Sequence, residues 1–323
     1  MAHKVVTIGG GTGTFVVLSA LRKLPTLTLT AIVSSADDGG STGRLRDAYG
    51  FLPAGDARQA LVALAEDGNV LRDLFAYRFT KSEVAGHNLG NLFLTALTDL
   101  LGSDSAALEE ASKILRVCGK VIPATKIPAT LIATLADGST VRGENTLDEH
   151  TPGRPRITKL SYEVPTPASP AALEAVHDAD ILFLGPGDLY ASSIAPLLAE
   201  GLKDAVKESK GKIVYIMNLF TKSGQTGGMR ASDYLAEITR YAGKEPSHIL
   251  LHANGGFADE VLQKYRQEGE SPVEDDLGDD PRVHRASIAS VHVVPPVLGD
   301  PVPRSLARHD PEKLSIALAT LLS

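Results

Sequence analysis

The chain has 323 residues, of which 43% are hydrophobic, and its net charge is −7. This length suffices for one large α/β domain or two smaller ones. The negative charge argues against nucleic acid as a partner, because phosphate backbones are bound by basic surfaces. The single cysteine, Cys118, excludes an internal disulfide and a thiolate metal site, and it suits a reducing cytosol. We see no signal peptide and no run of the roughly 18 apolar residues that a membrane span needs, so we expect a cytoplasmic protein.

The chain opens with a strand, a glycine loop, a helix and a second strand. The β-branched run 4–8 predicts a buried parallel strand, and GGGTG follows it at 9–13. Phe15, Leu18 and Leu21 have helical spacing, and 27–33 is a second apolar run. This order is the βαβ unit of a doubly wound sheet.

Helical patterns dominate the next hundred residues. Asp56 is placed to cap a helix that Gly68 ends, and Asn69 begins another. A third helix runs from Asn88 to Gly102, and a fourth covers about 105–117.

From about residue 120 to 165 the pattern changes to a β-rich insertion. Asp137-Gly138 separates two alternating runs and predicts a hairpin, and 157–165 adds another strand. The α/β rhythm then resumes, with a helix expected from 194 to 209. The later strands are expected at 180–184, 212–218, 248–253 and 290–295, and Asp310 with Pro311 starts a final helix. The acidic run 274–280 is interpreted as a solvated loop. We predict one domain over 1–323, a Rossmann-like doubly wound, mostly parallel sheet with helices on both faces and this small insertion.

The GGGTG loop is a candidate anion site. Free N–H groups at a helix start bind phosphate, and glycine lets the phosphate approach the backbone. Thr14 stands where the third glycine of a dinucleotide fingerprint belongs, so the loop matches an NAD-binding motif only in part. A tight turn without a ligand is the plain alternative.

The stretch SSADDGGSTGRLRD, residues 34–47, combines carboxylates and arginines with a second glycine loop. Asp37 or Asp38 can take sugar hydroxyls or Mg²⁺, and Arg44 can hold phosphate. Adjacent side chains rarely point the same way, so one of the two acids is expected to be structural. A solvated turn is the alternative.

Two helix starts add further candidates. Capping alone explains Asp56, whereas Arg58 opposes the helix dipole and is expected to have an anionic partner. His87 and Asn88 begin an apolar helix whose first turn holds Asn91; a structural role is the alternative for each.

Two later loops, 185–193 and 218–228, also follow predicted strands. Several polar glycine loops at strand ends favour one ligand cleft at the carboxyl edge of the sheet. Neither a nucleophile elbow nor a P-loop kinase pattern occurs.

In this order, these motifs resemble the gluconeogenesis factor family, within the 2-phospho-L-lactate transferase superfamily. The resemblance rests on stretches spread over nearly the whole chain: IGGGTGTFVVLSALR, SSADDGGSTGRLR, LPAGDARQALVALA, FAYRF, GHNLGNLFLTAL, LADGSTVRGE, GPGDLYASSIAPLL, YIMNLFT and RHDPEKL. It implies a Rossmann-like fold, binding of a UDP-sugar such as UDP-N-acetylglucosamine, and a role in carbon metabolism, cell shape and wall synthesis. It does not imply an enzymatic activity for this branch.

Motifs and resemblance together give the candidate ligand-binding residues. They are Gly10, Gly11, Thr12, Gly13, Asp37, Asp38, Ser41, Arg44, Arg58, His87, Asn88, Asn91, Gly185, Gly187, Asp188, Tyr190, Asn218, Thr221 and Arg308. Asp38 is the one candidate metal ligand. Arg308 lies in the RHDP motif, where the family pattern implies a nucleotide-sugar contact.

The chain departs from the family pattern at three positions. Gln225 replaces a carboxylate that many relatives carry, Tyr234 stands where a histidine is often expected, and Asp188 where a serine is common. The first two departures favour binding without turnover, and the third bears on the ligand preference of its loop.

Two functions of different classes remain. The first is a regulator that binds a nucleotide sugar, needs no cofactor and acts through cell-wall or metabolic protein partners, with homo-oligomerisation expected. The second is a transferase of a phosphoryl-linked group that uses Mg²⁺ at Asp38 beside the diphosphate. An NAD-dependent oxidoreductase is a third and weaker reading.

Overall fold

The computed structural model describes residues 2–253, 255–290 and 306–322. Seven of its strands form a parallel sheet in the order β10-β9-β8-β7-β1-β2-β3, and three form a small antiparallel sheet in the order β5-β4-β6. The strands are β1 (His3–Gly9), β2 (Leu27–Val33), β3 (Lys120–Pro123), β4 (Leu131–Leu135), β5 (Thr140–Arg142), β6 (Ile157–Tyr162), β7 (Ile181–Leu184), β8 (Lys212–Ile216), β9 (His248–His252) and β10 (Val283–Ala286).

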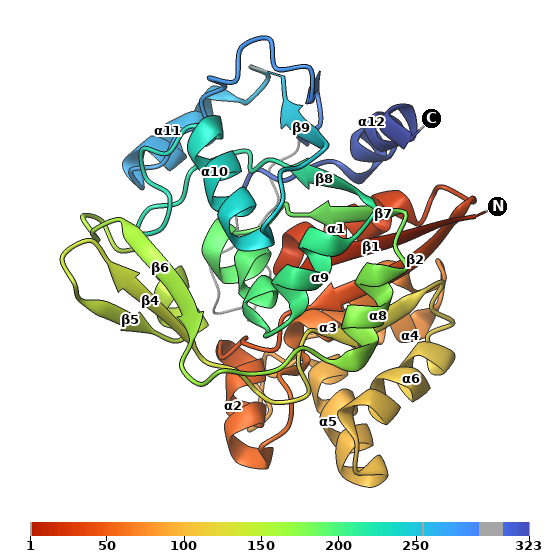
Figure 1. Cartoon of the computed structure of the whole chain (residues 1–323). Helices are drawn as coiled ribbons and strands as arrows, with labels where there is room; N and C mark the ends of the chain where they lie inside the picture. The colour runs from red at the N-terminus through yellow and green to blue at the C-terminus, as the bar shows by residue number, and fades with distance from the viewer. Residues whose placement is uncertain (1, 254, 291–305, 323) are drawn as a thin grey trace.

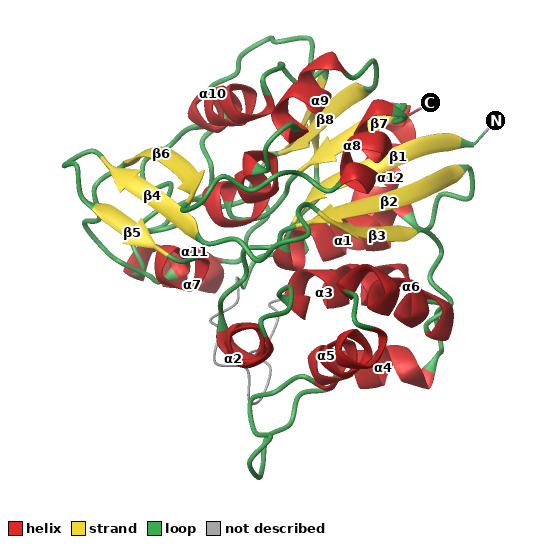
Figure 2. Cartoon of the chain, turned by 60° about the horizontal axis from the view of Figure 1, so that its bottom comes forward, coloured by secondary structure: helices red, strands yellow, loops and turns green. Residues whose placement is uncertain are grey.

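Helices cover both faces of the main sheet (Figures 1 and 2). They are α1 (Gly11–Leu21), α2 (Gly40–Tyr49), α3 (Ala54–Leu64), α4 (Val70–Ala76), α5 (Leu89–Leu101), α6 (Asp104–Ile114), α7 (Glu144–Asp148), α8 (Pro170–His177), α9 (Leu202–Glu208), α10 (Ala231–Ala242), α11 (Asp259–Gln267) and α12 (Pro311–Leu322). The Rossmann-like prediction is therefore confirmed.

The strands of the main sheet are buried on both faces, because successive side chains point to opposite sides. Val5 packs with α1, α3 and α12 on one face, whereas Val6 packs with α8 and α9 on the other. Leu182 and Phe183 alternate in the same way on β7. The result is two hydrophobic cores separated by the sheet.

The small sheet lies on the side toward which the main strands run (Figure 1). The predicted turn at Asp137-Gly138 joins β4 and β5, and the carboxylate of Asp137 accepts from the backbone N–H of Ser139 at 2.9 Å. The predicted start of the insertion at about residue 120 is wrong, because β3 pairs in parallel with β2 in the main sheet. The described strands of the small sheet cover 131–162.

Several local predictions also need correction. Residues 40–49, interpreted as a glycine loop, form helix α2. The helix expected over 194–209 is instead a 3-10 turn (Ala195–Leu198) followed by α9, and a π-helical turn (Leu189–Ile194) covers the end of the loop predicted at 185–193. The strand expected at 290–295 lies almost entirely outside the described residues, and β10 was not foreseen.

Three helix starts match their predicted caps. The side chain of Asn69 accepts from the N–H of Leu71, that of Asn88 from the N–H of Gly90, and that of Asp310 from the N–H of Glu312. No helix within the described ranges is long and apolar enough to cross a membrane.

Candidate functional site

The order of the strands places a topological switch point between β1 and β7. β1 pairs in parallel with β2 on one side and β7 on the other, and the chain winds outward in both directions. Ligands of open α/β sheets bind outside the carboxyl ends of the strands at such a point. The loops after β1 and β7, both predicted from sequence, flank it.

These two loops touch each other closely. A Cβ built at Gly13 would lie 2.0 Å from the carbonyl oxygen of Pro186. This oxygen belongs to the backbone, so it could move away only if the whole loop moved. The packing of α1 against the loop after β7 therefore explains Gly13 without a ligand.

Asp56 occupies the start of α1. The N–H of Gly11 donates to Oδ1 of Asp56 at 2.7 Å, and a Cβ at Gly10 would lie 2.2 Å from its Oδ2. The predicted capping role of Asp56 is wrong, because α3 begins at Ala54 and Pro53 stands at its N-cap position. Asp56 instead places a carboxylate in the anion-binding position that the glycine loop offers.

Asp37 lies beside Asp56. Its Oδ1 accepts from the N–H of Gly39 at 3.0 Å, and a Cβ at Gly55 would lie 2.2 Å from its Oδ2. Burial raises the pKa of Asp37, although the bonds from Gly39 and Thr42 act in the opposite direction. Burial and the charge of Asp37 likewise raise the pKa of Asp56 to about 7. Two neighbouring carboxyl groups thus resist simultaneous ionisation.

A buried arginine faces these acids. Arg58 is 8% exposed, and its charge favours the ionised forms of Asp37 and Asp56. The charge of Arg58 thus acts on two carboxyl groups, and the expectation of an anionic partner for this arginine stays a prediction. Its Nε donates to Oδ1 of Asn91 at 2.9 Å. Burial of a charged arginine is tolerated because it is surrounded by compensating groups.

Asn91 links this arginine to the loop after β2. Its Nδ2 lies 3.2 Å from Oγ1 of Thr42 and 3.4 Å from Oγ of Ser41. Ser41 Oγ also lies 3.1 Å from Nδ1 of His87 and accepts from the N–H of Asn88 at 3.3 Å. Two predicted motifs, 34–47 and 86–91, are therefore held together by hydrogen bonds in which Ser41 and Thr42 take part.

Helix α7, which follows β5 of the small sheet, brings an acid to the same place. Burial, with the charges of Asp37, Asp148 and Asp56, raises the pKa of Glu144 well above its usual range. Asp38 accepts from the N–H of Asn145 at 2.7 Å, so it ties the loop after β2 to α7. We call Asp37, Asp56, Arg58, Asn91 and Glu144 the switch-point cluster.

A second charged group joins three loops. Lys222 pairs with Asp148 of α7 and, at 2.7 Å, with Asp188 of the loop after β7. Burial and Asp188 raise the pKa of Asp148 to about 7. Burial opposes ionisation of Asp188, but Lys222 outweighs it and the pKa of Asp188 lies below its ordinary value. We call these three residues the Lys222 clasp.

The remaining predicted residues fall into two groups. Gly185 and Gly187 follow the end of β7 and Asn218 follows the end of β8, so they lie at the same edge of the sheet, where Nδ2 of Asn218 donates to the carbonyl of Gly187 at 2.6 Å. Thr12 belongs to α1, and Arg44 is exposed on α2 and helps burial to lower the pKa of His87.

Three more predicted residues have contacts outside the cluster. Tyr190 is fully buried, and its hydroxyl lies 3.3 Å from Oε2 of Glu237, so the structure does not bring it to the cluster. The hydroxyl of Thr221 bonds to the backbone of Ser271. The carbonyl of Arg308 accepts from the N–H of Ser290.

Sequence reasoning missed Glu144, Asp148 and Lys222, and it left Asp56 out of the site. The acids of residues 144–148 follow a hairpin, where the sequence alone offers only a solvated turn. Within the described parts of the chain, no group of three or more His, Cys, Asp or Glu side chains is arranged to hold a metal ion by itself.

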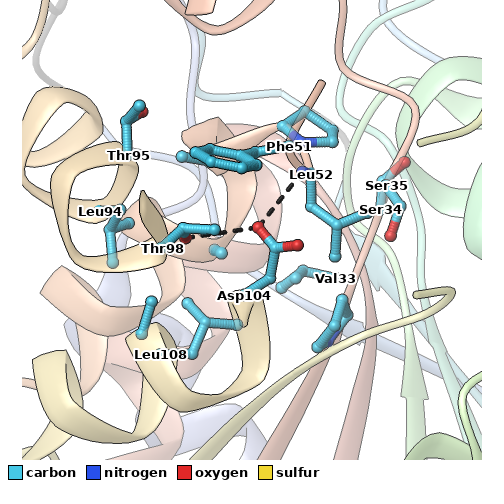
Figure 3. A pocket seen from close by; sticks show the side chains of 15 residues that line it. Val33, Ser34, Ser35, Phe51, Leu52, Leu94, Thr95, Thr98, Asp104 and Leu108 are labelled. Atoms are coloured by element: carbon cyan, nitrogen blue, oxygen red, sulfur yellow. Dashed lines mark hydrogen bonds between the residues drawn. The ribbon is translucent and has the colours of Figure 1, made fainter. Parts of the chain in front are cut away.

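A small cavity lies apart from the cluster, between β2, α3, α5 and α6 (Figure 3). Its volume of about 30 Å³ has room for roughly two water molecules. Asp104 lines it and accepts from the N–H of Leu52 at 3.3 Å and the hydroxyl of Thr98 at 3.4 Å. The cavity is too small for a metabolite, so it is not part of the candidate site.

The sheet and its switch-point cluster define a Rossmann-like α/β protein with acidic and basic side chains gathered at the carboxyl edge. The comparisons agree with this class. The family model of 2-phospho-L-lactate transferase CofD matches residues 5–294. A crystal structure of a UPF0052 family protein from Bacillus halodurans superposes with a TM-score of 0.87 at 35% identity, covering 99% of each chain.

Two curated relatives show the same relationship. The chain is 38% identical to the "Putative gluconeogenesis factor" of Thermotoga maritima over 97% of both chains. It is 38% identical to the gluconeogenesis factor of Bacillus subtilis, over 85% of this chain and 86% of that protein. The chain therefore belongs to the 2-phospho-L-lactate transferase CofD family, and within that family it groups with the gluconeogenesis factors.

Proposed function

We propose that the chain binds a nucleotide sugar, UDP-N-acetylglucosamine or a related UDP-sugar, over the switch-point cluster. In this proposal the bound state is a signal that links carbon metabolism to cell shape and wall synthesis through protein partners. The observation that carries the proposal is the gathering of Asp37 and Asp56 beside Arg58 at the switch point, with Glu144 near enough for its charge to interact with both acids.

The chemistry of the cluster supports a ligand with both hydroxyls and phosphates. Ionised carboxylates accept hydrogen bonds from hydroxyls, and protonated carboxyls donate them. The pKa of Asp56, raised to about 7 by burial and by the charge of Asp37, gives this carboxyl group both forms near neutral pH. Arg44 is exposed on α2, the helix that follows the loop containing Asp37. In this proposal Arg44 supplies the positive charge that binds the diphosphate.

Calorimetric titration tests the proposal directly. The wild-type chain is titrated with UDP-N-acetylglucosamine, UDP-glucose, GDP and NAD, with and without Mg²⁺. Arg44→Ala should weaken UDP-sugar binding by about tenfold or more, since a charge-assisted hydrogen bond is lost. Arg46→Ala is the matched control, because Arg46 lies on the same helix and pairs with Asp47. Absence of UDP-sugar binding by the wild-type chain would overturn the proposal.

The acids of the cluster favour one alternative. Carboxylates are preferred ligands of Mg²⁺, and a cation shared with a bound diphosphate would relieve their mutual repulsion. That arrangement suits a transferase of a phosphoryl-linked group. Binding of GDP that requires Mg²⁺ and is lost in Asp38→Asn, together with no response to UDP-sugars, would favour the transferase.

A further inference from the structure

A cavity of about 150 Å³ lies at the carboxyl ends of β8 and β9. Leu219, Leu251 and Val273 give it apolar walls, and Phe257 with His252 adds two aromatic rings. The ring centres of Phe257 and His252 are 5.0 Å apart, with an angle of 56° between their planes. The cavity therefore presents flat apolar surfaces rather than a set of charges.

His252 contributes to this surface as a neutral ring. Its Nδ1 accepts from the N–H of Ile288 at 3.2 Å, and its Nε2 donates to the carbonyl of Gly255 at 3.1 Å. Both ring nitrogens are thus occupied, and burial lowers the pKa of His252. No Asp, Glu, Lys or Arg lines the cavity within the described residues, which makes it unsuited to phosphate.

The size of the cavity limits what it can hold. An apolar cavity of about 150 Å³ in a protein interior binds benzene, so this one has room for a single six-membered ring. Two fused rings would need more space. A pyrimidine ring fits this volume, whereas the two fused rings of a purine would extend beyond it.

Asn218 connects the cavity to the candidate site. It lines the cavity, and its Nδ2 donates to the carbonyl of Gly187 at 2.6 Å. A Cβ built at Gly187 would lie 3.6 Å from the carbonyl oxygen of Gly10, so Gly187 sits beside the loop after β1. The cavity thus lies further along the same carboxyl edge, on the side of β8 and β9.

We propose that this cavity takes the pyrimidine ring of the nucleotide and makes the chain prefer uridine to guanosine nucleotides. The inference rests on the proposed function for the presence of a nucleotide, and it adds the part of the site that reads the base. It places the base over β8 and β9 and the phosphates over β1 and β7.

Two variants change the cavity in opposite directions. Val273→Phe fills it, and the expected result is at least tenfold weaker binding of UDP and UDP-sugar. Phe257→Ala enlarges it, and the expected result is a smaller ratio of UDP to GDP affinity. Phe257 is half-buried in a loop, so its truncation should be tolerated even if Val273→Phe fails to fold. Val164→Phe is the control, because Val164 is 66% exposed just after β6.

The titrations use UDP, GDP, UMP and free uridine, and ligand-observed NMR follows uridine where affinity is low. Equal binding of UDP and GDP by the wild-type chain would overturn the inference. Unchanged base preference in both cavity variants would overturn it as well, while the proposed function would stand if Arg44→Ala still weakened UDP-sugar binding. Binding of uridine without binding of any UDP-sugar would support the base pocket and refute the proposed function.

Discussion

The backbone N–H of Gly11 donates to the carboxylate of Asp56 across 2.7 Å. Asp56 therefore takes the position at the start of α1 where a phosphate would otherwise bind. Its pKa, raised to about 7 by burial and by Asp37, means that this internal anion is half neutralised near physiological pH. A bound diphosphate and an ionised Asp56 compete for the same donors.

The affinity for a UDP-sugar should therefore depend on pH. Binding by the wild-type chain is expected to weaken as the pH rises from 6 to 8, by up to about tenfold per unit above the pKa of Asp56, because one proton is coupled to binding. Asp56→Asn should remove most of this slope. Calorimetry at pH 6, 7 and 8 measures it, and parallel slopes in the two proteins would contradict the competition.

The same group should affect stability. The folded-state pKa of Asp56 is raised from an ordinary 3.8 to about 7, so the folded state holds a proton that the unfolded state releases. Stability from this group is present at low pH and is lost as the pH rises through 4 to 7. At pH 8 Asp56→Asn should be more stable than the wild-type chain by roughly 2 to 4 kcal/mol, and the gap should close toward pH 4. Chemical denaturation across this range checks the sign, and a gap that widens on acidification would refute it.

The Lys222 clasp should be fragile when its cation is removed. Lys222→Met leaves Asp148 and Asp188 facing each other without a compensating charge. We expect a loss of about 2 to 3 kcal/mol in the free energy of unfolding. This is less than the usual cost of breaking a fully buried ion pair, because these three side chains keep some exposure. Adding Asp148→Asn should restore part of the loss. Lys113→Met is the control, since Lys113 is 72% exposed; equal effects of the two lysine changes would refute the role of the clasp.

His309 should destabilise the fold in acid. It is buried against the carbonyl of Met217, and burial lowers its pKa to about 4. An unfolded histidine takes up a proton near pH 6.5, so this contribution to stability is present above pH 6.5 and is lost as the pH falls toward 4. In His309→Gln the stability should change less over that window. Urea titrations at pH 4.5, 5.5 and 6.5 give the comparison, and identical curves for both proteins would contradict it.

Gly13 should tolerate no side chain. Gly13→Ala would place a Cβ against the backbone of Pro186, and separating α1 from the loop after β7 should cost about 1 to 3 kcal/mol, as overpacking does. Gly227→Ala is the control, because a Cβ there meets no atom within 4 Å. Melting temperatures of the two variants decide the point; equal values would show that the loops separate freely.

The main sheet could be predicted from the sequence because its strands are apolar on both faces. The predicted run 27–33 coincides with β2, and 180–184 differs from β7 by one residue. β10 was not predicted because His284 and Arg285 interrupt the continuous apolar run that is typical of a strand buried on both faces. Helix α2 escaped because Gly40 and Gly43 disfavour helices, yet a Cβ at Gly43 would meet the backbone of Asp38 at 2.1 Å. Close packing, which periodicity does not report, overrides propensity there.

The site was predictable only in part. The sequence motifs identified Asp37, Arg58 and Asn91 as candidates, and the fold brings them together. The sequence could not show that Asp56 reaches across to α1, because a local capping role was enough to explain that residue. Glu144 and Lys222 come from segments far away in the chain, and only the packing of α7 against the loops after β7 and β8 brings them in.

The central position of β1 has a consequence for synthesis. Val5 pairs with Leu29 on one side and with Ile181 on the other. While a ribosome is still making the segment between β3 and β7, β1 is an edge strand whose free N–H and C=O groups face no partner. Exposed edges recruit other chains. Stalled or truncated synthesis in that interval should therefore yield aggregation-prone fragments. The exposed edge of β1 in a nascent chain needs protection from other chains until β7 has been synthesised and pairs with it.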